Sequence, residues 1–232
     1  MLHPNDIQHL ANNRWYSALP PIFQDFILQQ AQIQHYDKEQ AIFHSGEAFN
    51  GIYAVLEGAV RLGYVDIEGT ESIAAIVEPI MWFGEISLID QQPRSHDAIA
   101  VQKVRILHIP SAAIYRLLQQ QPQFWFHIAQ LTSQKLRMAC LELISIQTQT
   151  IRQRLALRLM LILQGYGNHV LIENNVIQLS QEQLAQMLTC SRQTVNQELQ
   201  ALEKQGILKL AFRKIEIIDQ ALLHQLAYTA QN

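Results

Sequence analysis

The side chains best suited to specific recognition lie near the carboxyl end, on one face of a predicted helix. Val195, Leu199 and Leu202 recur at helical spacing and define its buried stripe. The opposite face carries a guanidinium and planar amides, from Arg192, Gln193, Asn196, Gln197 and Gln200. Arginine can pair with guanine, and asparagine or glutamine with adenine, through two hydrogen bonds each. This face therefore has the chemistry needed to read the edges of bases.

Two short capped helices are predicted to hold this face in place. Ser180 and Gln183 form a capping box that starts the first helix. The chain then turns near Thr189 and Cys190, and Ser191 caps the second helix. This pattern predicts a helix-turn-helix.

A basic hairpin is predicted after Gly206, which ends the second helix. Residues 207–210 and 215–218 predict its two strands, and Phe212-Arg213-Lys214 forms the tip. Together with the two helices it predicts a winged helix-turn-helix that binds double-stranded DNA, with Arg213 and Lys214 on phosphates. The alternative is a three-helix domain whose glutamines are merely solvated.

A second group of functional side chains interrupts a β-rich region at residues 83–98. Gly84 frees the backbone for a close approach, and Glu85, Arg94 and Ser95 supply an acceptor, a planar cation and a hydroxyl. Arginine beside serine suits a phosphate, and a carboxylate can accept hydrogen bonds from ribose hydroxyls. The alternative is an ordinary solvated loop.

Short strands must position this second group. Residues 33–109 contain β-rich runs separated by turn residues, at 41–43, 51–56, 59–65, 71–77 and 104–109. Regularly spaced short strands predict a sandwich or barrel. A short helix is expected before them at residues 21–31, and another, capped by Ser111, extends to about Gln120.

Residues 122 to about 145 contain no glycine and, after Pro122, no proline, which predicts one long helix. A seam of coiled-coil spacing is formed by Trp125, Ile128, Thr132, Leu136, Ala139, Leu143 and Ile146. A second apolar face comprises Phe124, Leu131, Met138, Leu141 and Ile144. One face can pack on the β domain while the seam meets a second copy of the chain. The alternative is a helix buried within one chain.

A polar break at residues 147–150 precedes another amphipathic helix, at 152–164, and marks a boundary. The predicted fold class is α+β. Its parts are an amino-terminal β domain at 1–121, a long dimerisation helix and hinge at 122–149, and a carboxyl-terminal winged helix-turn-helix domain at 150–232.

Composition excludes several classes of protein. The chain has 232 residues, of which 49% are hydrophobic and 16% charged, as in ordinary globular proteins. No run is long enough to span a membrane and no secretory signal begins the sequence, so we expect a cytoplasmic protein. Two cysteines cannot form a four-thiolate metal site. The net charge is −5 over residues 1–150 and +2 over residues 151–232, which permits a polyanionic partner at the carboxyl end.

The β-rich segment with residues 83–98 and the predicted helix-turn-helix together resemble the Crp/Fnr family of bacterial transcription regulators. The resemblance covers nearly the whole chain, from IFHSGEAFNGIYAVLEGAVRL through residues 83–98 to residues 190–202. The resemblance implies a β-roll effector domain similar to cyclic-nucleotide-binding domains, and a near-palindromic operator. It assigns the ribose 2′-hydroxyl to Glu85, the cyclic phosphate to Arg94 and Ser95, and a backbone contact to Gly84. It places Arg192, Gln193 and Gln197 at base-reading positions. With the residues chosen on their own chemistry, the predicted DNA contacts are Ser191, Arg192, Gln193, Asn196, Gln197, Arg213 and Lys214.

The sequence departs from the family pattern at several positions. Ala139-Cys140 align where the cyclic-AMP-binding member has Thr-Ser on the long helix, which affects the purine contact. His96 stands where a small residue is usual, and Gln193 and Gln197 stand where Glu and Arg are frequent. The operator is therefore expected to differ from the best-known consensus of the family.

These patterns predict a homodimeric DNA-binding transcription regulator that is not an enzyme and has no catalytic residue, metal site or obligatory cofactor. Cyclic AMP or a similar nucleotide is the expected effector, and RNA polymerase is an expected partner. One alternative is an effector-independent or redox-responsive regulator with a vestigial pocket. Another is a cyclic-nucleotide-binding protein that acts on a protein instead of DNA.

Overall fold

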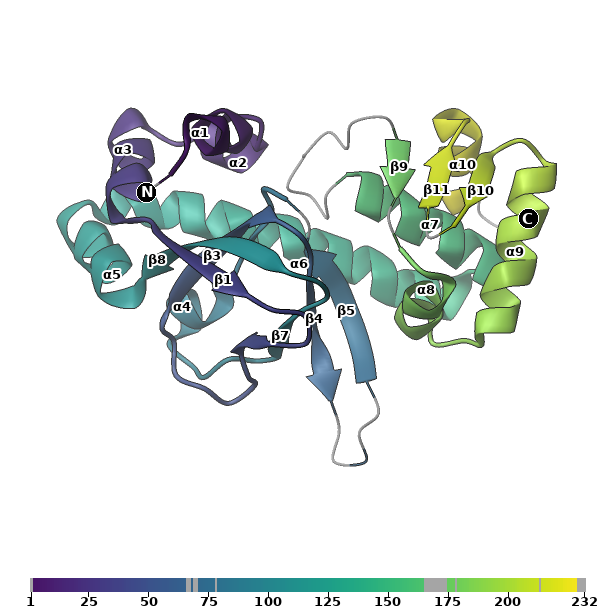
Figure 1. The fold of residues 1–232 in the computed structure, drawn as a ribbon, viewed down its shortest axis with the longest axis horizontal. Coiled ribbons are helices and arrows are strands. Elements are labelled where there is room, and N and C mark those ends of the chain that lie inside the picture. The colour runs from purple at the N-terminus through teal and green to yellow at the C-terminus, as the bar shows by residue number, and fades with distance from the viewer. Residues whose placement is uncertain are drawn as a thin grey trace. The chain divides into compact units, whose positions relative to one another are not determined.

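The structure is a computed structural model that describes residues 2–65, 68, 71–77, 79–164, 175–177, 179–212 and 214–228. These residues form two compact units that divide within one long helix, between Gln134 and Lys135. Figure 1 labels most of the helices and strands of both units.

The amino-terminal unit is built on two four-stranded antiparallel sheets (Figure 1). Their strand orders are β1-β8-β3-β6 and β2-β7-β4-β5. The strands are β1 (Gln32–Tyr36), β2 (Ala41–Phe43), β3 (Gly51–Glu57), β4 (Val60–Val65), β5 (Glu71–Val77), β6 (Trp82–Phe83), β7 (Asp97–Ala100) and β8 (Val104–Pro110). The five β-rich runs of the sequence correspond to β2, β3, β4, β5 and β8, which confirms the predicted β domain.

Helices surround these sheets. They are α1 (Pro4–Ala11), α2 (Arg14–Ser17), α3 (Pro21–Gln30), α4 (Ile86–Asp90), α5 (Ser111–Gln120) and the 3-10 turn η1 (Pro122–Phe124). The predicted helices at 21–31 and 111–120 are α3 and α5. The predicted cap of α5 is wrong, because Pro110 occupies the N-cap position and no side chain caps the helix there.

The two amino-terminal helices, which the sequence did not indicate, close one side of the hydrophobic core. The rings of Trp15 and Tyr16 pack on Trp82, with centroids 5.1 and 6.5 Å away. Trp15 Nε1 donates to the carbonyl oxygen of His127 at 2.7 Å. Both aromatic side chains of α2 are thereby buried.

The long helix α6 (Trp125–Thr148) is the element that the glycine-free segment predicted. In the second half of the predicted seam, Leu136, Leu143 and Ile146 are exposed, and their role in a dimer stays a prediction. It is wrong at Ile128, which is fully buried in the core of the amino-terminal unit. Ile144, assigned to the other face, is exposed. The first turns of α6 cover the β domain and so orient Ile128 inward.

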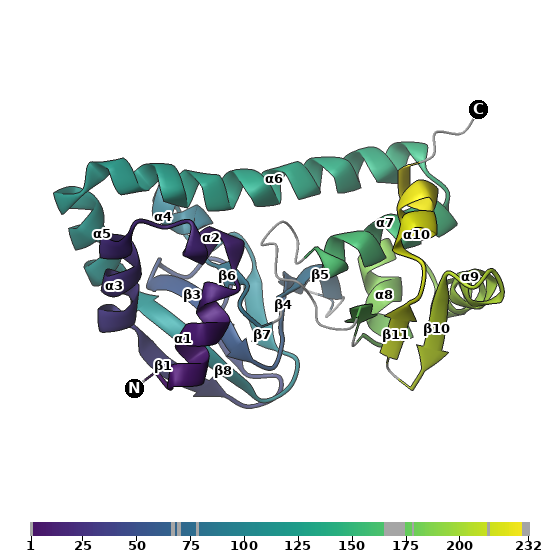
Figure 2. The same cartoon turned by 90° about the horizontal axis from the view of Figure 1, so that it is seen from above.

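The carboxyl-terminal unit contains the predicted helices and hairpin, with ends displaced by one residue. Its helices are α7 (Ile151–Leu163), α8 (Gln181–Leu188), α9 (Arg192–Lys204) and α10 (Gln220–Tyr228). A sheet of order β10-β11-β9 contains β9 (Val176–Ile177), β10 (Leu208–Ala211) and β11 (Lys214–Ile217). Figure 2 shows α9 beside the β10–β11 hairpin. The capping box of Ser180 and Gln183 is present as predicted.

Candidate functional site

Helix α9 has the two faces that its sequence indicates. Val195, Leu199 and Leu202 are completely buried. The exposed polar side chains on its other side are Arg192, Gln193, Gln197 and Gln200. Ser191 caps the helix, and its Oγ accepts a hydrogen bond from Thr194 N at 3.0 Å. The apolar stripe therefore fixes α9 on the core and leaves the guanidinium and amides in solvent.

Asn196 differs from the other amides of α9. It is half-buried, and its Oδ1 accepts a hydrogen bond from Gln181 Nε2 at 3.0 Å. This bond links the start of α8 to the middle of α9. The Asn196 amide group therefore holds the two helices together and keeps its NH₂ group as a donor.

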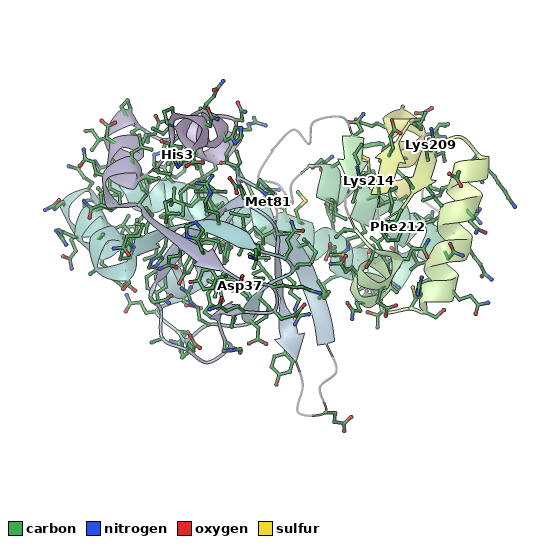
Figure 3. The ribbon with its side chains drawn as sticks, viewed as in Figure 1. His3, Asp37, Met81, Lys209, Phe212 and Lys214 are labelled. Carbon is green, nitrogen blue, oxygen red and sulfur yellow. The ribbon has the colours of Figure 1, made fainter. Side chains whose placement is uncertain are left out.

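A hollow of about 420 Å³ lies between α8, α9 and the hairpin. Its lining includes Gln181 and Glu182 from α8, Arg192 from α9, and Phe212 and Lys214 from the hairpin. Figure 3 labels Lys209, Phe212 and Lys214 on this hairpin. Arg213, also predicted to contact DNA, lies outside the described residues.

Both acidic residues of α9 are engaged by the protein itself. A carboxylate oxygen of Glu198 lies 2.6 Å from Arg152 Nε. Glu203 Oε1 accepts a hydrogen bond from Leu210 N at 2.7 Å, which ties the end of α9 to β10. These pairings direct the two carboxylates to the protein rather than to a ligand at the polar face.

Two arginines of α7 fix the end of α8. Arg154 Nη2 donates to Leu188 O at 2.8 Å and Arg158 Nη2 to Met187 O at 3.3 Å, where the helix leaves unpaired carbonyls at its negative end. Arg158 Nη1 also lies 2.8 Å from Glu142 Oε1 of α6. Burial raises the pKa of Glu142, an effect that Arg158 opposes. These contacts set the position of the turn between α8 and α9.

The second candidate site, in the amino-terminal unit, includes a turn at Gly84, between β6 and α4. Gly84 has φ +91°, and a Cβ atom there would lie 3.1 Å from Arg94 Nη1 and 3.3 Å from Gly51 O. The backbone conformation therefore favours glycine, and a larger residue would also need its neighbours to move by a few tenths of an ångström. Glu85 follows it, buried at the start of α4.

Arg94 is almost fully buried and joins two parts of this site. Its Nη1 donates to Gly84 O at 2.8 Å, and its Nη2 donates to Gly51 O at 2.7 Å and to Asn50 Oδ1 at 2.6 Å. Burial lowers the pKa of Arg94, an effect that Tyr53 and then Glu85 oppose. Nε of Arg94 is buried with no hydrogen-bond partner among the described residues. A phosphate oxygen would satisfy this remaining donor.

The sequence did not indicate Asn50 or the aromatic side chains around Arg94. Asn50 Oδ1 accepts from both Arg94 and the Tyr53 hydroxyl, the latter at 2.7 Å. The guanidinium carbon lies 4.2 Å from the ring centre of Phe43 and 5.0 Å from that of Phe49. Asn50 and Gly51 lie 44 and 43 positions from Arg94 in the chain, so only the folded structure reveals these contacts.

Ser95 is exposed, and its Oγ lies 2.9 Å from His96 Nδ1. The structure thus brings Gly84, Glu85, Arg94 and Ser95 into one part of the amino-terminal unit. Ala139 and Cys140 are both exposed and belong to the other unit, so their contact with a purine stays a prediction.

Neither cysteine of the described chain is in a disulfide. Burial raises the pKa of the Cys190 thiol, an effect that Arg154 opposes. Among the described residues no cluster of three His, Cys, Asp or Glu side chains could hold a metal ion. Within the same residues no helix is both long and apolar enough to cross a membrane.

Comparison with known proteins assigns a family to each part of the chain. Residues 33–121 match the cyclic nucleotide-binding domain, and residues 153–226 match the Crp-like helix-turn-helix domain. The cyclic AMP receptor protein of Thermus thermophilus is 31% identical over 214 residues, which cover 92% of this chain and 96% of that protein. A CRP-like cAMP-activated global transcriptional regulator of Mycobacterium tuberculosis is 25% identical over 201 residues, or 85% of this chain and 88% of that protein.

The fold is similar to that of solved structures. FixK2 from Bradyrhizobium japonicum has a TM-score of 0.76 to this chain at 23% identity, covering 87% of this chain and 99% of the FixK2 chain. At this level of identity the likeness concerns the fold alone.

Proposed function

Because this chain belongs to the Crp/Fnr family of transcription regulators, we propose that it binds a near-palindromic operator in double-stranded DNA as a homodimer, under the control of a small effector. The observation that carries this proposal is helix α9, whose exposed face presents a guanidinium and amides while its opposite, apolar face is buried. Membership of this family agrees with the expectation that the chain is not an enzyme.

The proposed DNA contacts divide into base readers and phosphate contacts. Arg192 reads a guanine, and Gln193 and Gln197 read adenines or other base edges in the major groove. Asn196 can donate from its NH₂ group while its oxygen accepts a hydrogen bond from Gln181. The phosphate contacts are Ser191, Arg213 and Lys214, which position the domain without reading sequence.

The proposed dimer forms along α6. Leu136 and Leu143 are each 62% exposed, and Ile144 and Ile146 are exposed beside them. Leucine and isoleucine side chains that lie together on a helix surface are stabilised by burial against a second copy. Two-fold symmetry would place the two α9 helices about one turn of DNA apart, roughly 34 Å. A palindromic operator follows from this symmetry.

The proposed effector is a cyclic nucleotide, with cyclic AMP as the first candidate because the named relatives respond to it or bear its name. Arg94 would offer its buried Nε to the phosphate, and Ser95 its exposed hydroxyl. Glu85 would accept from the ribose 2′-hydroxyl, and Gly84 would lend its backbone. Ala139 and Cys140 would meet the purine with weak or no hydrogen bonds.

Three alternatives depart from different parts of this proposal. An effector-independent regulator would keep the DNA contacts and the dimer. A redox-responsive regulator would use a cysteine, but the raised pKa of Cys190 disfavours the reactive thiolate. A cyclic-nucleotide-binding protein that acts on another protein would not need the exposed polar face of α9.

The proposal also includes RNA polymerase as a partner and a cytoplasmic location.

Selection of bound sequences from a random DNA pool, with and without cyclic AMP, tests this function. We expect enrichment of sequences with two inverted half-sites. Enrichment that depends on cyclic AMP supports effector control, and equal enrichment in both arms supports the effector-independent alternative. Failure to enrich any sequence in either arm would contradict operator binding.

A further inference from the structure

The tip of the β10–β11 hairpin carries an aromatic side chain that the fold does not require. Ala211 pairs with Lys214, so Phe212 begins a connection of two residues. Such connections favour glycine, asparagine and aspartate, because their backbone often needs positive φ. Leu208 and Ile217 of the strands are buried, whereas Phe212 is 89% exposed. Neither turn chemistry nor core packing explains a phenylalanine here.

Phe212 lies next to the surface that we propose binds DNA, which is the exposed polar face of α9 together with the hollow beside it. Phe212 lines the same hollow as Arg192 of α9 and Lys214 of β11 (Figure 3 labels the two hairpin residues). Glu203 holds the hairpin against the end of α9 through its bond to Leu210 N. A molecule held between α9 and the hairpin would therefore contact the phenyl ring and two cations together.

The side chains of Arg192, Phe212 and Lys214 suit the sugar-phosphate backbone of duplex DNA. Arginine and lysine attract phosphates, and an aromatic ring gains by covering the apolar faces of deoxyribose. If α9 lies in the major groove, one DNA strand occupies the hollow, and the hairpin tip reaches the minor groove beyond it. Apolar side chains contact minor grooves in other DNA-binding proteins.

We propose that Phe212 packs against deoxyribose rings on the minor-groove side of the strand whose phosphate Lys214 binds. This inference rests on the proposed DNA binding and adds an uncharged contact to it. Since deoxyribose is the same in every nucleotide, the contact adds affinity without sequence preference. Because Phe212 carries no charge, it releases no counterions and leaves the salt dependence of binding unchanged.

Titration of the selected operator at several salt concentrations tests this contact. The proteins compared are the unaltered chain and its Phe212→Ala, Phe212→Leu and Lys214→Ala variants. We expect Phe212→Ala to bind about tenfold more weakly at every salt concentration, with the same salt slope. Phe212→Leu should retain most of the affinity, and Lys214→Ala should lower the slope by about one. Thermal unfolding should be unchanged by Phe212→Ala, because the ring is exposed.

Hydroxyl-radical footprinting adds a direct readout, since the radicals attack deoxyribose from the minor groove. The unaltered chain should protect sugars flanking each half-site, and Phe212→Ala should lose that protection while keeping the rest of the footprint. Equal affinity of Phe212→Ala and the unaltered chain, or an unchanged footprint, would overturn the contact while leaving DNA binding intact. Absence of operator binding by the unaltered chain would overturn the proposed function itself.

Discussion

Single residues of α9 and the β10–β11 hairpin are expected to contact DNA in two distinct ways, by reading bases or by binding phosphates. Arg192 and Lys214 line the same hollow, yet one belongs to α9 and the other to the hairpin. Arg192→Ala should relax sequence preference at one operator position and cost roughly 1–3 kcal/mol there, because a bidentate pair is lost. Lys214→Ala should weaken binding to all sequences alike. Binding to a set of operators with single base changes measures both, and identical effects of the two changes on every sequence would refute the assignment.

Arg94 and Ser95 offer a matched pair in the candidate nucleotide site. Arg94 is buried with three hydrogen bonds to the protein, whereas Ser95 is exposed. Arg94→Ala should therefore lower the thermal stability of the free protein and abolish cyclic AMP binding. Ser95→Ala should weaken cyclic AMP binding with the free protein unchanged.

Thermal shift and calorimetry separate these two effects. A ligand at about 100 times its dissociation constant stabilises by roughly 2.7 kcal/mol. Unaltered cyclic AMP affinity in Arg94→Ala would show that the phosphate is bound elsewhere.

Residue types and spacing predicted the chemistry of α9 because the evidence is local. Each feature depends on residues only three to seven positions apart: Ser180 with Gln183, Ser191 with Thr194, and the apolar stripe from Val195 to Leu202. Asn50 could not be predicted in this way. Its contact with Arg94 joins residues 44 positions apart, and nothing in the local sequence distinguishes it from a turn asparagine.

At the scale of elements, α1 is attached to the β domain by an ion pair. Asp6 is buried and accepts two hydrogen bonds from Arg105 of β8, at 2.8 and 2.6 Å. Asp6→Asn should lower the free energy of unfolding by roughly 1–3 kcal/mol near neutral pH. Asp37→Asn is a matched control, because Asp37 is exposed and lies 3.7 Å from an equally exposed Lys103.

The same pair predicts a pH dependence. The hydrogen bonds from Arg105 hold the pKa of Asp6 below its ordinary value of 3.8. The folded state therefore binds this proton less readily than the unfolded chain, so the stabilisation is complete above about pH 4 and is lost as the pH falls further. Denaturant unfolding at several pH values should show the difference between the unaltered chain and Asp6→Asn shrinking in acid. A difference that grows in acid would contradict this role.

The exposed apolar side of α6 predicts a dimer that one charge can disrupt. Leu136→Glu would place two like charges at the interface without partners, and their burial is costly enough to separate the subunits. Sedimentation velocity should show monomers for this variant. Gln120→Glu on α5, an exposed position outside the interface, should remain dimeric. A dimeric Leu136→Glu variant would show that another surface forms the interface.

Periodicity predicted most elements but not their partners. The strands and the long helix follow from β-rich runs and from the absence of glycine. The burial of Ile128 depends instead on the β domain that α6 covers, which a coiled-coil spacing cannot reveal. Helices α1 and α2 were missed because their few apolar residues, such as Leu10 and Trp15, gain stability only from the distant Trp82 and its neighbours.

At the scale of the whole molecule, effector and DNA would bind to different units. Ala139 and Cys140 belong to the unit that contains α9, while the candidate nucleotide site belongs to the other. A ligand changes DNA affinity only through its differential affinity for two states. Replacing both residues, by Ala139→Thr and Cys140→Ser, should therefore strengthen the effect of cyclic AMP on operator binding. Operator titrations of both proteins with and without nucleotide check this, and an unchanged or smaller effect would contradict it.

In the proposed complex, two copies of this chain read two inverted half-sites together. Native mass spectrometry and titration of the selected operator test this, in parallel with an operator lengthened by about half a helical turn between its half-sites. We expect two chains per duplex, and affinity for the lengthened operator that falls to the level of unrelated DNA. One chain per duplex, or equal affinity for both operators, would contradict it.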